Sequence, residues 1–366
     1  MAEPASAPSQ DSPPPSCARC KSNPATIKLR ADLTCPLGLL RKELVGPREK
    51  RTCKYVAGLS FGPSSTALVH VLDENLRYVR ARANSNSPAA YDLVVVHVDT
   101  DLRPPSPTAA ADSHPDSAAT LQLQRYRERF PDLEFQLVPL SYAFGISSID
   151  WSSLPSTDPA LDPQARMQAL FDALPSVTSR ADILRLLIRH ILLSVAADNS
   201  CEGLLLGCTT TALAELTLSE LARGKPPRSM QIYYPLRDIF RNEIHTFLRL
   251  ADPPLTGLAV ANPPSSAEVV SHKDLSIEEA MVRYFESVEE GYPAVVANVV
   301  RTTGRLTRAG AVDAEGEQGS VACGLCGMAV DESGDARWKG EIGVGPEEEG
   351  RAGAPLCYGC ERSIRG

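Results

Sequence analysis

The sequence predicts an α/β fold in which helices cover a parallel β-sheet. Strand-like and helix-like segments alternate between about residues 51 and 308, which is typical of strands joined by crossover helices. Residues 93–98 read Leu-Val-Val-Val-His-Val, a nearly continuous apolar run that indicates a strand buried on both faces. With 43% hydrophobic and 22% charged residues, the 366-residue chain has the composition of a globular protein with one large domain and a small appendage.

The individual elements follow from apolar runs and apolar periodicity, taken in chain order. Strands are predicted at residues 54–59, 93–98, 135–140, 203–206 and 231–234. Helices are predicted at residues 65–75, 118–130, 163–173, 181–197, 209–222, 238–250, 277–290 and 293–302. In the segment 181–197, apolar residues recur at helical spacing, but Arg185, Arg189 and His190 interrupt them. This segment is therefore predicted to be an amphipathic core helix and not a membrane span.

Composition divides the chain into five parts. Residues 1–16 contain five prolines and are predicted to be a disordered tail. An N-terminal cysteine module at 17–50 precedes the core domain at 51–308, which carries an insertion at 101–117. A linker at 309–322 leads to a C-terminal zinc ribbon at 323–366 with an acidic, glycine-rich insertion. The first residues lack the pattern of a signal peptide, and we expect a soluble, cytoplasmic protein.

Two Cys-x-x-Cys pairs near the C-terminus have the spacing of a metal site. In a reducing compartment such pairs more often hold metal than form disulfides. Four thiolates that fill a tetrahedral shell are typical of a structural zinc site. The predicted ligands are Cys323, Cys326, Cys357 and Cys360. The alternatives are a pair of redox dithiols and a site that has lost its metal.

The N-terminal cluster is less complete. Cys17 and Cys20 form a third Cys-x-x-Cys pair, and Cys35 follows, but Gly38 stands where a fourth local thiol is expected. We assign Cys17, Cys20 and Cys35 as candidate zinc ligands. Cys53 or a more distant residue would complete the shell, unless the site has decayed.

The segment after the first core strand has the form of a phosphate-binding turn. Residues 57–66 read Ala-Gly-Leu-Ser-Phe-Gly-Pro-Ser-Ser-Thr and open a helix. Such a turn can present backbone N–H groups and a helix N-terminus to a phosphate. It is not a Walker A loop, because Gly-Lys-Ser/Thr does not close it. The simpler interpretation is a turn with a serine N-cap.

The same segment resembles the pyrophosphate loop of N-type ATP pyrophosphatases, whose pattern is Ser-Gly-Gly-x-Asp-Ser. Ser60, Gly62 and Ser65 match this pattern, whereas Phe61 replaces the first glycine and Ser64 replaces the aspartate. Phenylalanine is poorly suited to the positive φ angles that glycine adopts, and it adds bulk where backbone should approach phosphate. We therefore expect a degenerate nucleotide loop.

The variant Gly-Pro-Ser-Ser at 62–65 resembles the cytoplasmic tRNA 2-thiolation protein 2 family. Further matching segments lie in the same order at 178–183, 206–213, 222–228, 234–238 and 299–306. At 206–213, active relatives carry Gly-His-Asn-x-Asp-Asp, whereas this chain reads Leu-Gly-Cys-Thr-Thr-Thr-Ala-Leu. The resemblance covers most of residues 17–362. It implies an ATP-pyrophosphatase core, of the adenine nucleotide alpha hydrolase-like class, with zinc-ribbon-like cysteine modules at both ends.

The resemblance also implies a function. In the active partner subfamily, ATP adenylates the carbonyl of the wobble uridine of tRNA, and a sulfur donor then displaces AMP. This chain lacks the loop aspartate and the acidic pair, so we expect no catalytic residues, little or no ATP binding and the role of a pseudo-enzyme subunit. The implied partners are the catalytic thiolation subunit in a heterodimer, tRNA, and a ubiquitin-like sulfur carrier that acts directly or through that subunit.

Contact with tRNA requires a local basic face, because the net charge of the chain is −8. The candidate tRNA-binding residues are Arg223, Lys225, Arg228, Arg301, Arg305 and Arg308. A solvated run of charges is the alternative interpretation of each stretch.

Two other functions remain as alternatives at this point. The first is a stand-alone ATP-dependent tRNA sulfurtransferase with an altered pocket. The second is a zinc-dependent interaction scaffold without a role in RNA binding.

Overall fold

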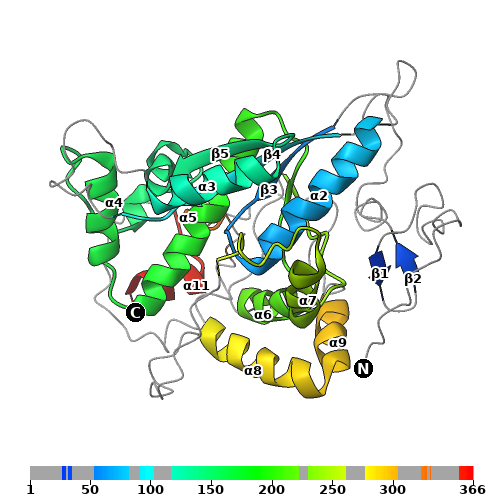
Figure 1. The fold of residues 1–366 in the computed structure, drawn as a ribbon. Coiled ribbons are helices and arrows are strands. Elements are labelled where there is room, and N and C mark those ends of the chain that lie inside the picture. Colours follow the sequence, from blue (N-terminus) through cyan, green and yellow to red (C-terminus); the bar gives the residue numbers. More distant parts are fainter. Residues whose placement is uncertain are drawn as a thin grey trace, which may run out of the picture.

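A five-stranded parallel sheet forms the centre of the protein (Figure 1). The computed structural model describes residues 27–29, 32–34, 53–81, 91–102, 117–221, 230–260, 277–303, 323–327, 330 and 354–365. The strand order is β5-β4-β3-β6-β7. The strands are β3 (Cys53–Gly58), β4 (Tyr91–Asp99), β5 (Glu134–Pro139), β6 (Gly203–Leu205) and β7 (Gln231–Tyr233). In the central strand, Val56 pairs with Val94 on one side and with Leu204 on the other.

Helices cover both faces of this sheet, as a parallel sheet requires. One face packs on α2 (Pro63–Ala81), α3 (Ala118–Arg129) and α7 (Arg241–Leu250), through residues such as Val95 and Leu68. The other face packs on α4 (Pro163–Asp172) and α5 (Val177–Asp198), through Val94, Val96 and Leu187. Alternate valines of β4 thus enter opposite halves of the core, which confirms the prediction of a strand buried on both faces.

A third, smaller part of the hydrophobic core joins α6 (Thr210–Leu221), α8 (Ile277–Gly291) and α9 (Pro293–Thr303). Figure 1 shows α8 and α9 at one end of the molecule, below α6 and α7. The C-terminal helix α11 (Tyr358–Arg365) lies instead beside α5. The remaining elements are the short antiparallel pair β1 (Ile27–Leu29) and β2 (Asp32–Thr34), and the 3-10 helices η1 (Leu140–Gly145) and η2 (Trp151–Ser153).

The predicted strands and helices are all present, and their ends shift where capping decides them. Helix α5 begins at Val177 and not at residue 181, because the Ser176 hydroxyl accepts a hydrogen bond from the Ser179 amide at 3.0 Å. Helix α7 begins at Arg241 and not at residue 238, since the Glu243 carboxylate accepts from the Phe240 amide at 2.8 Å. The hairpin β1–β2, the two 3-10 helices and α11 were not predicted.

The sheet topology brings two loops of interest to the same edge. The chain passes from the edge strand β5 through α4 and α5 to β6, which pairs with β3. From β3 the chain continues to β4 on one side, and from β6 it continues to β7 on the other. The strand order therefore reverses between β3 and β6, and ligands of open α/β sheets bind at the carboxyl edge of such a point. Residues 59–62 and 206–209 occupy these loops. Within the described ranges, we find no helix with the length and apolarity that a bilayer span requires.

Buried His70 gives the fold a predicted dependence on pH. Burial, with smaller contributions from Arg129 and Arg77, lowers the pKa of His70 to about 4. The unfolded chain has a histidine pKa of about 6.5, so it binds more protons than the native state between the two values. Stability present above pH ~6.5 should thus be lost as the pH falls towards ~4, by about 1–3 kcal/mol. Urea unfolding measured across this pH range should show a smaller loss of stability for His70→Leu than for wild type. An equal loss in both proteins would contradict the lowered pKa of His70.

Candidate functional site

Two backbone amides of the loop after β3 donate to serine hydroxyls of the loop itself and of the first turn of α2. The Ser65 hydroxyl accepts from the Ser60 amide at 3.2 Å and donates to the Gly62 carbonyl at 3.0 Å. The Ser60 hydroxyl accepts from the Gly62 amide at 3.4 Å and lies 3.1 Å from the Ser65 hydroxyl. Two amides that would otherwise be available to a phosphate therefore bond to the hydroxyls of Ser60 and Ser65. Ser64, which replaces the aspartate of the resembled pattern, is half-buried at the start of α2.

Phe61 adopts the left-handed backbone conformation that favours glycine. Its φ angle is 61°, and its side chain is buried. The ring stacks on His97 with 3.9 Å between centroids and lies 5.3 Å from the ring of Tyr126. A left-handed non-glycine residue costs about 1–2 kcal/mol, and burial of the aromatic ring offsets this cost. The phenylalanine thus fills the space beside the loop with an apolar stack.

A neighbouring segment closes over this stack. The Val260 amide donates to the Phe61 carbonyl at 2.8 Å. The Leu258 carbonyl accepts from the Gln122 side chain at 2.6 Å and from the Tyr126 hydroxyl at 3.3 Å. His97 contributes its Nδ1 to a 2.7 Å hydrogen bond with the Leu59 carbonyl. The surroundings of Phe61 are therefore a packed part of the core.

The positive φ of Phe61 predicts an unusual order of stability between two substitutions. Phe61→Ala and Phe61→Gly both remove the buried ring and should destabilise the protein by about 2–5 kcal/mol. Because only glycine adopts positive φ without strain, Phe61→Gly should be the more stable of the two by about 1 kcal/mol. Chemical denaturation of both variants measures this difference. A glycine variant less stable than the alanine variant would contradict the left-handed assignment.

The loop after β6 lies against the first loop. A Cβ atom on Gly207 would lie 2.9 Å from the Ser64 carbonyl oxygen and 3.0 Å from the Ser65 Cα, so only glycine permits this close approach. The following threonines are buried and use their hydroxyls structurally. The Thr209 hydroxyl accepts from the Ala212 amide at 3.2 Å, and the Thr210 hydroxyl donates to the Arg237 carbonyl at 2.8 Å.

Thr211 belongs to a buried polar network between α6, α7 and α8. Its hydroxyl donates a short hydrogen bond to the Glu289 carboxylate, which is itself buried. The other oxygen of Glu289 accepts from the Asn242 amide at 3.1 Å, at the N-terminus of α7. Arg241 donates to both oxygens of Glu215 at 2.7 Å. Burial nevertheless raises the pKa of Glu215, against the attraction of Arg241. Thr211 and the Asn242 amide thus anchor α8 to α6 and α7 through Glu289.

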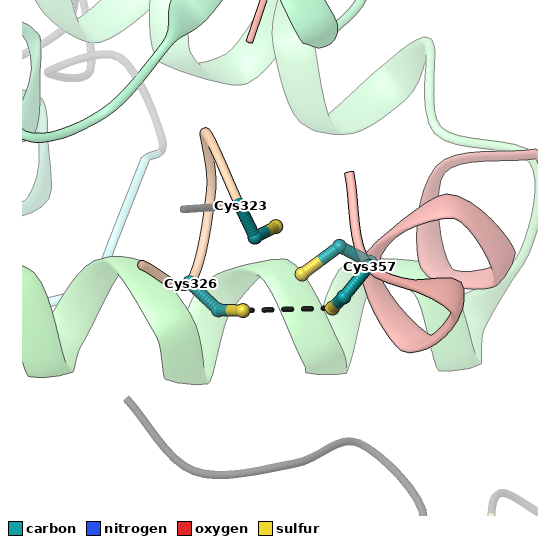
Figure 2. A group of neighbouring side chains, drawn as sticks. Cys323, Cys326 and Cys357 are labelled. Carbon is teal, nitrogen blue, oxygen red and sulfur yellow. Dashed lines mark hydrogen bonds between the residues drawn. The ribbon is translucent and has the colours of Figure 1, made fainter. Parts of the chain in front are cut away.

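The four C-terminal cysteines form a compact cluster. The Sγ atoms of Cys323, Cys326, Cys357 and Cys360 all lie within 4.8 Å of one another. One hydrogen bond between the two pairs joins Cys326 and Cys357, with 3.5 Å between their sulfurs. Figure 2 shows the sulfurs of the labelled cysteines pointing toward one another. A tetrahedral zinc ion with Zn–S bonds of about 2.3 Å holds its sulfurs about 3.8 Å apart, so the donor set and its spacing fit one ion.

The environment of the cluster suits thiolate ligands. Cys323, Cys357 and Cys360 are buried, and Cys326 is partly exposed. Hydrogen bonds from the thiols of Cys326, Cys357 and Cys360 lower the pKa of the Cys323 thiol. Gly327, which ends the first turn of the cluster, has φ 70°, and its amide donates to the Cys323 carbonyl at 2.8 Å. The Cys357 carbonyl likewise accepts from the Glu361 amide in α11.

Three polar side chains of the core hold these turns. His190 of α5 donates from Nε2 to the Leu325 carbonyl at 2.7 Å, and burial lowers its pKa. Asp150 accepts from the Ala354 amide at 2.6 Å, while its own amide donates to the Gly324 carbonyl. Hydrogen bonds from Ser152 and Ala354 lower the pKa of Asp150. Asp182 accepts from Ser363 at 2.7 Å. The sequence alone did not single out these residues as supports for a metal site.

A groove of about 730 Å³ runs along α5 beside the cluster. Its lining includes Leu193, Leu206 and Ile232 from the core, and Cys326 and Cys360 from the cluster.

The structure places some of the other predicted site residues. Arg301 is exposed on α9. The other candidate tRNA-binding residues (Arg223, Lys225, Arg228, Arg305 and Arg308) lie outside the described residues, as do the N-terminal cysteines Cys17, Cys20 and Cys35. Cys201 is buried and Cys208 partly exposed in the core. The assignments of the tRNA-binding residues and of the N-terminal zinc ligands stay predictions, as do the domain boundaries.

Comparison with known proteins identifies the relatives of the chain. The family model described as cytoplasmic tRNA 2-thiolation protein 2 matches residues 276–351. A protein of that name from Sclerotinia sclerotiorum is 36% identical over 310 residues, covering 77% of this chain and 80% of its own length. One from Phaeosphaeria nodorum is 32% identical over 385 residues, covering 95% and 94%.

Among solved structures, the chain aligns with the U34-tRNA thiolase NcsA from Methanococcus maripaludis, solved with its [4Fe-4S] cluster. The TM-score is 0.46 and the identity 14%, over 90% of this chain and 97% of that chain. This level of likeness supports no conclusion about the site. The identity and coverage of the sequence relatives, by contrast, show that the chain belongs to the cytoplasmic tRNA 2-thiolation protein 2 family.

Proposed function

We propose that this protein is a non-catalytic subunit of the cytoplasmic complex that 2-thiolates the wobble uridine of tRNA. Its partner is a catalytic thiolation subunit, and the sulfur comes from a ubiquitin-like carrier. Membership of the family supports the role in tRNA 2-thiolation, and the relatives' names give the compartment. The absence of catalysis rests on the two loops at the carboxyl edge of the sheet.

The observation that carries the proposal is the internal hydrogen bonding of the first loop. Its Ser60 and Gly62 amides donate to serine hydroxyls, and Phe61 fills the adjoining space. After the second loop, Thr211 in the first turn of α6 donates to Glu289 at a position where the resemblance implies an acidic residue in active relatives. Magnesium-bound phosphates require carboxylate ligands and free backbone donors. The residues present do not fit ATP, and we assign no step of the reaction to this chain.

We further propose that the C-terminal cysteine cluster holds one structural zinc ion. Four sulfurs within 4.8 Å of one another fit a single tetrahedral ion. Two independent redox dithiols are less consistent with the close approach of Cys326 to Cys357, which belong to different pairs. A zinc ion bound by Cys323, Cys326, Cys357 and Cys360 would supply no chemistry to the reaction. Its role would be to fasten the C-terminal segment to α5.

The proposed contact with tRNA uses basic side chains. Arg301 on α9 is solvent-accessible, and a guanidinium group in this position can bind phosphate without reading sequence. Phosphate contacts position the RNA, while recognition of the wobble base is assigned to the catalytic subunit.

The experiment measures 2-thiolation of the wobble uridine in tRNA from cells that lack this protein. Thiolated tRNA is retarded in mercury-containing gels, and we expect the retarded band to disappear. Ser64 stands where an active loop carries its aspartate. Wild type and Ser64→Ala should restore the band equally, because the proposed loop binds no nucleotide. Restoration by wild type alone would assign nucleotide binding to the loop. A band that persists without the protein would contradict the proposed role.

A further inference from the structure

A serine and a histidine lie together in the groove along α5. The Ser148 hydroxyl lies 3.2 Å from Nδ1 of His190. Nε2 of His190 lies 2.7 Å from the Leu325 carbonyl oxygen. Because this carbonyl can only accept, Nε2 carries the proton of the neutral ring, and Nδ1 accepts from Ser148. A hydroxyl, an imidazole and a third group that orients the imidazole are the parts of an activated nucleophile and its base.

The turn that carries Ser148 is held by the core on both sides. Ile146 and Ile149 are buried, and the Ile149 amide donates to the Ile146 carbonyl at 3.4 Å. The Ile146 amide in turn donates to the Ala143 carbonyl at 3.0 Å. Ser148 itself is exposed, and its amide makes no hydrogen bond with another residue that the structure describes. The hydroxyl is therefore accessible to a substrate, and the amide is available as a donor to a developing oxyanion.

The groove has the size and the lining of a binding site for an apolar group. Its volume is about 730 Å³, and Ser148 and His190 both line it. Aliphatic side chains supply much of its wall, among them Leu186 and Leu193 of α5 and Leu206 after β6. Small-molecule sites commonly have volumes of about 300–1,000 Å³ and apolar walls with a few polar groups. An acyl group attached to Ser148 would therefore find apolar side chains beside it.

We propose that Ser148 is a nucleophile for carboxylic esters with an apolar acyl group, which the groove along α5 accommodates, and that His190 is its base. The Ser148 oxygen attacks the carbonyl carbon, and its proton passes to Nδ1 of His190. The bond between this carbon and the alkoxy oxygen breaks, and His190 gives the proton to the leaving alcohol. Water then attacks the acyl-serine in the same way, which releases the carboxylic acid and restores Ser148. This activity is separate from the proposed role in thiolation.

The test combines two measurements on the full-length chain. A fluorophosphonate probe labels activated serines, and p-nitrophenyl butyrate reports ester hydrolysis. We expect the label on the peptide that contains Ser148, and both rates should fall by about 100-fold or more in Ser148→Ala. His190→Gln keeps a side-chain donor for the Leu325 carbonyl but provides no base, so it should lower both rates by a similar factor. Ser147→Ala is the matched control, because Ser147 is also exposed in the groove but is not the serine bonded to His190. It should behave like wild type.

Several results would overturn the inference. If wild type takes no label, or if Ser148→Ala takes the label and hydrolyses the ester as fast as wild type, Ser148 is not a nucleophile. If His190→Gln reacts at the wild-type rate, His190 only supports the Leu325 turn. Labelling of Ser148 without ester hydrolysis would exclude the proposed turnover. Equal circular dichroism and metal content show that the variants are folded. Ser148→Ala should still restore thiolated tRNA in cells, so this inference and the proposed function can fail separately.

Discussion

Cys357→Ser is expected to abolish metal binding at the C-terminal cluster and to detach the segment that contains it. The Cys357 sulfur lies 3.5 Å from that of Cys326 in the other pair, so its loss opens the shell between the two turns. A structural zinc ion with three thiolates loses most of its affinity, and binding energy at such sites is folding energy. We expect the loss of one equivalent of metal and of at least about 3 kcal/mol of stability.

The measurement is the metal content of the purified protein by plasma mass spectrometry, with a denaturation curve. Cys201→Ser is the matched control, because Cys201 is buried to a similar degree but lies outside the cluster. It should keep its metal. Equal metal content in wild type and both variants would refute the assignment. Iron in place of zinc would overturn the identity of the ion while leaving its ligands in place.

Thr211→Asp should destabilise the fold strongly, although it introduces an acidic residue at a position where the resemblance to N-type ATP pyrophosphatases implies one. Thr211 is fully buried and donates to the Glu289 carboxylate, so a second carboxylate would face the first one in the core. Buried like charges cannot both ionise at little cost, and an uncompensated buried charge costs about 3–5 kcal/mol. The anchor of α8 is therefore incompatible with a restored acidic pair.

Two further variants isolate the charge effect. Thr211→Asn has nearly the same shape as the aspartate variant but no charge, and it should cost clearly less. Glu289→Gln in combination with Thr211→Asp removes one of the two charges and should recover most of the loss, which gives a coupling energy in a double-mutant cycle. Equal stabilities of the aspartate and asparagine variants, or the absence of recovery, would disprove the buried contact.

The sheet and the helices were predictable because their signals are local. A run such as residues 93–98 is typical of a strand in the middle of a parallel sheet, and the periodicity of α5 shows which side faces the core. Helix α11 was missed because it is only eight residues long. Its first turn also contains Cys360, which predicts a metal-binding turn equally well. The beginning of α5 depended on Ser176, a cap that the apolar pattern does not show.

For the candidate site, the sequence predicted which residues take part but not the long-range contacts that hold them. The spacing of the four C-terminal cysteines indicated one cluster, and the structure confirms that their sulfurs converge. His190 was not predictable as a support, because its partner is a backbone carbonyl 135 residues away. The same holds for Glu289, whose bond to Thr211 spans 78 residues. Phe61 was expected to be unsuited to positive φ, but its stack on His97 allows the left-handed conformation.

The central claim is that this chain is required for thiolation but does not catalyse it. The most direct test is a reconstituted reaction with a tRNA transcript, ATP and a sulfur donor, assayed for AMP release and for thiolated uridine. We predict neither product with the purified chain alone, and both when the catalytic subunit is added, at a rate that depends on this chain. AMP and thiolated tRNA formed by this chain alone would contradict the account, because the loop after β3 would then have to bind and activate the nucleotide.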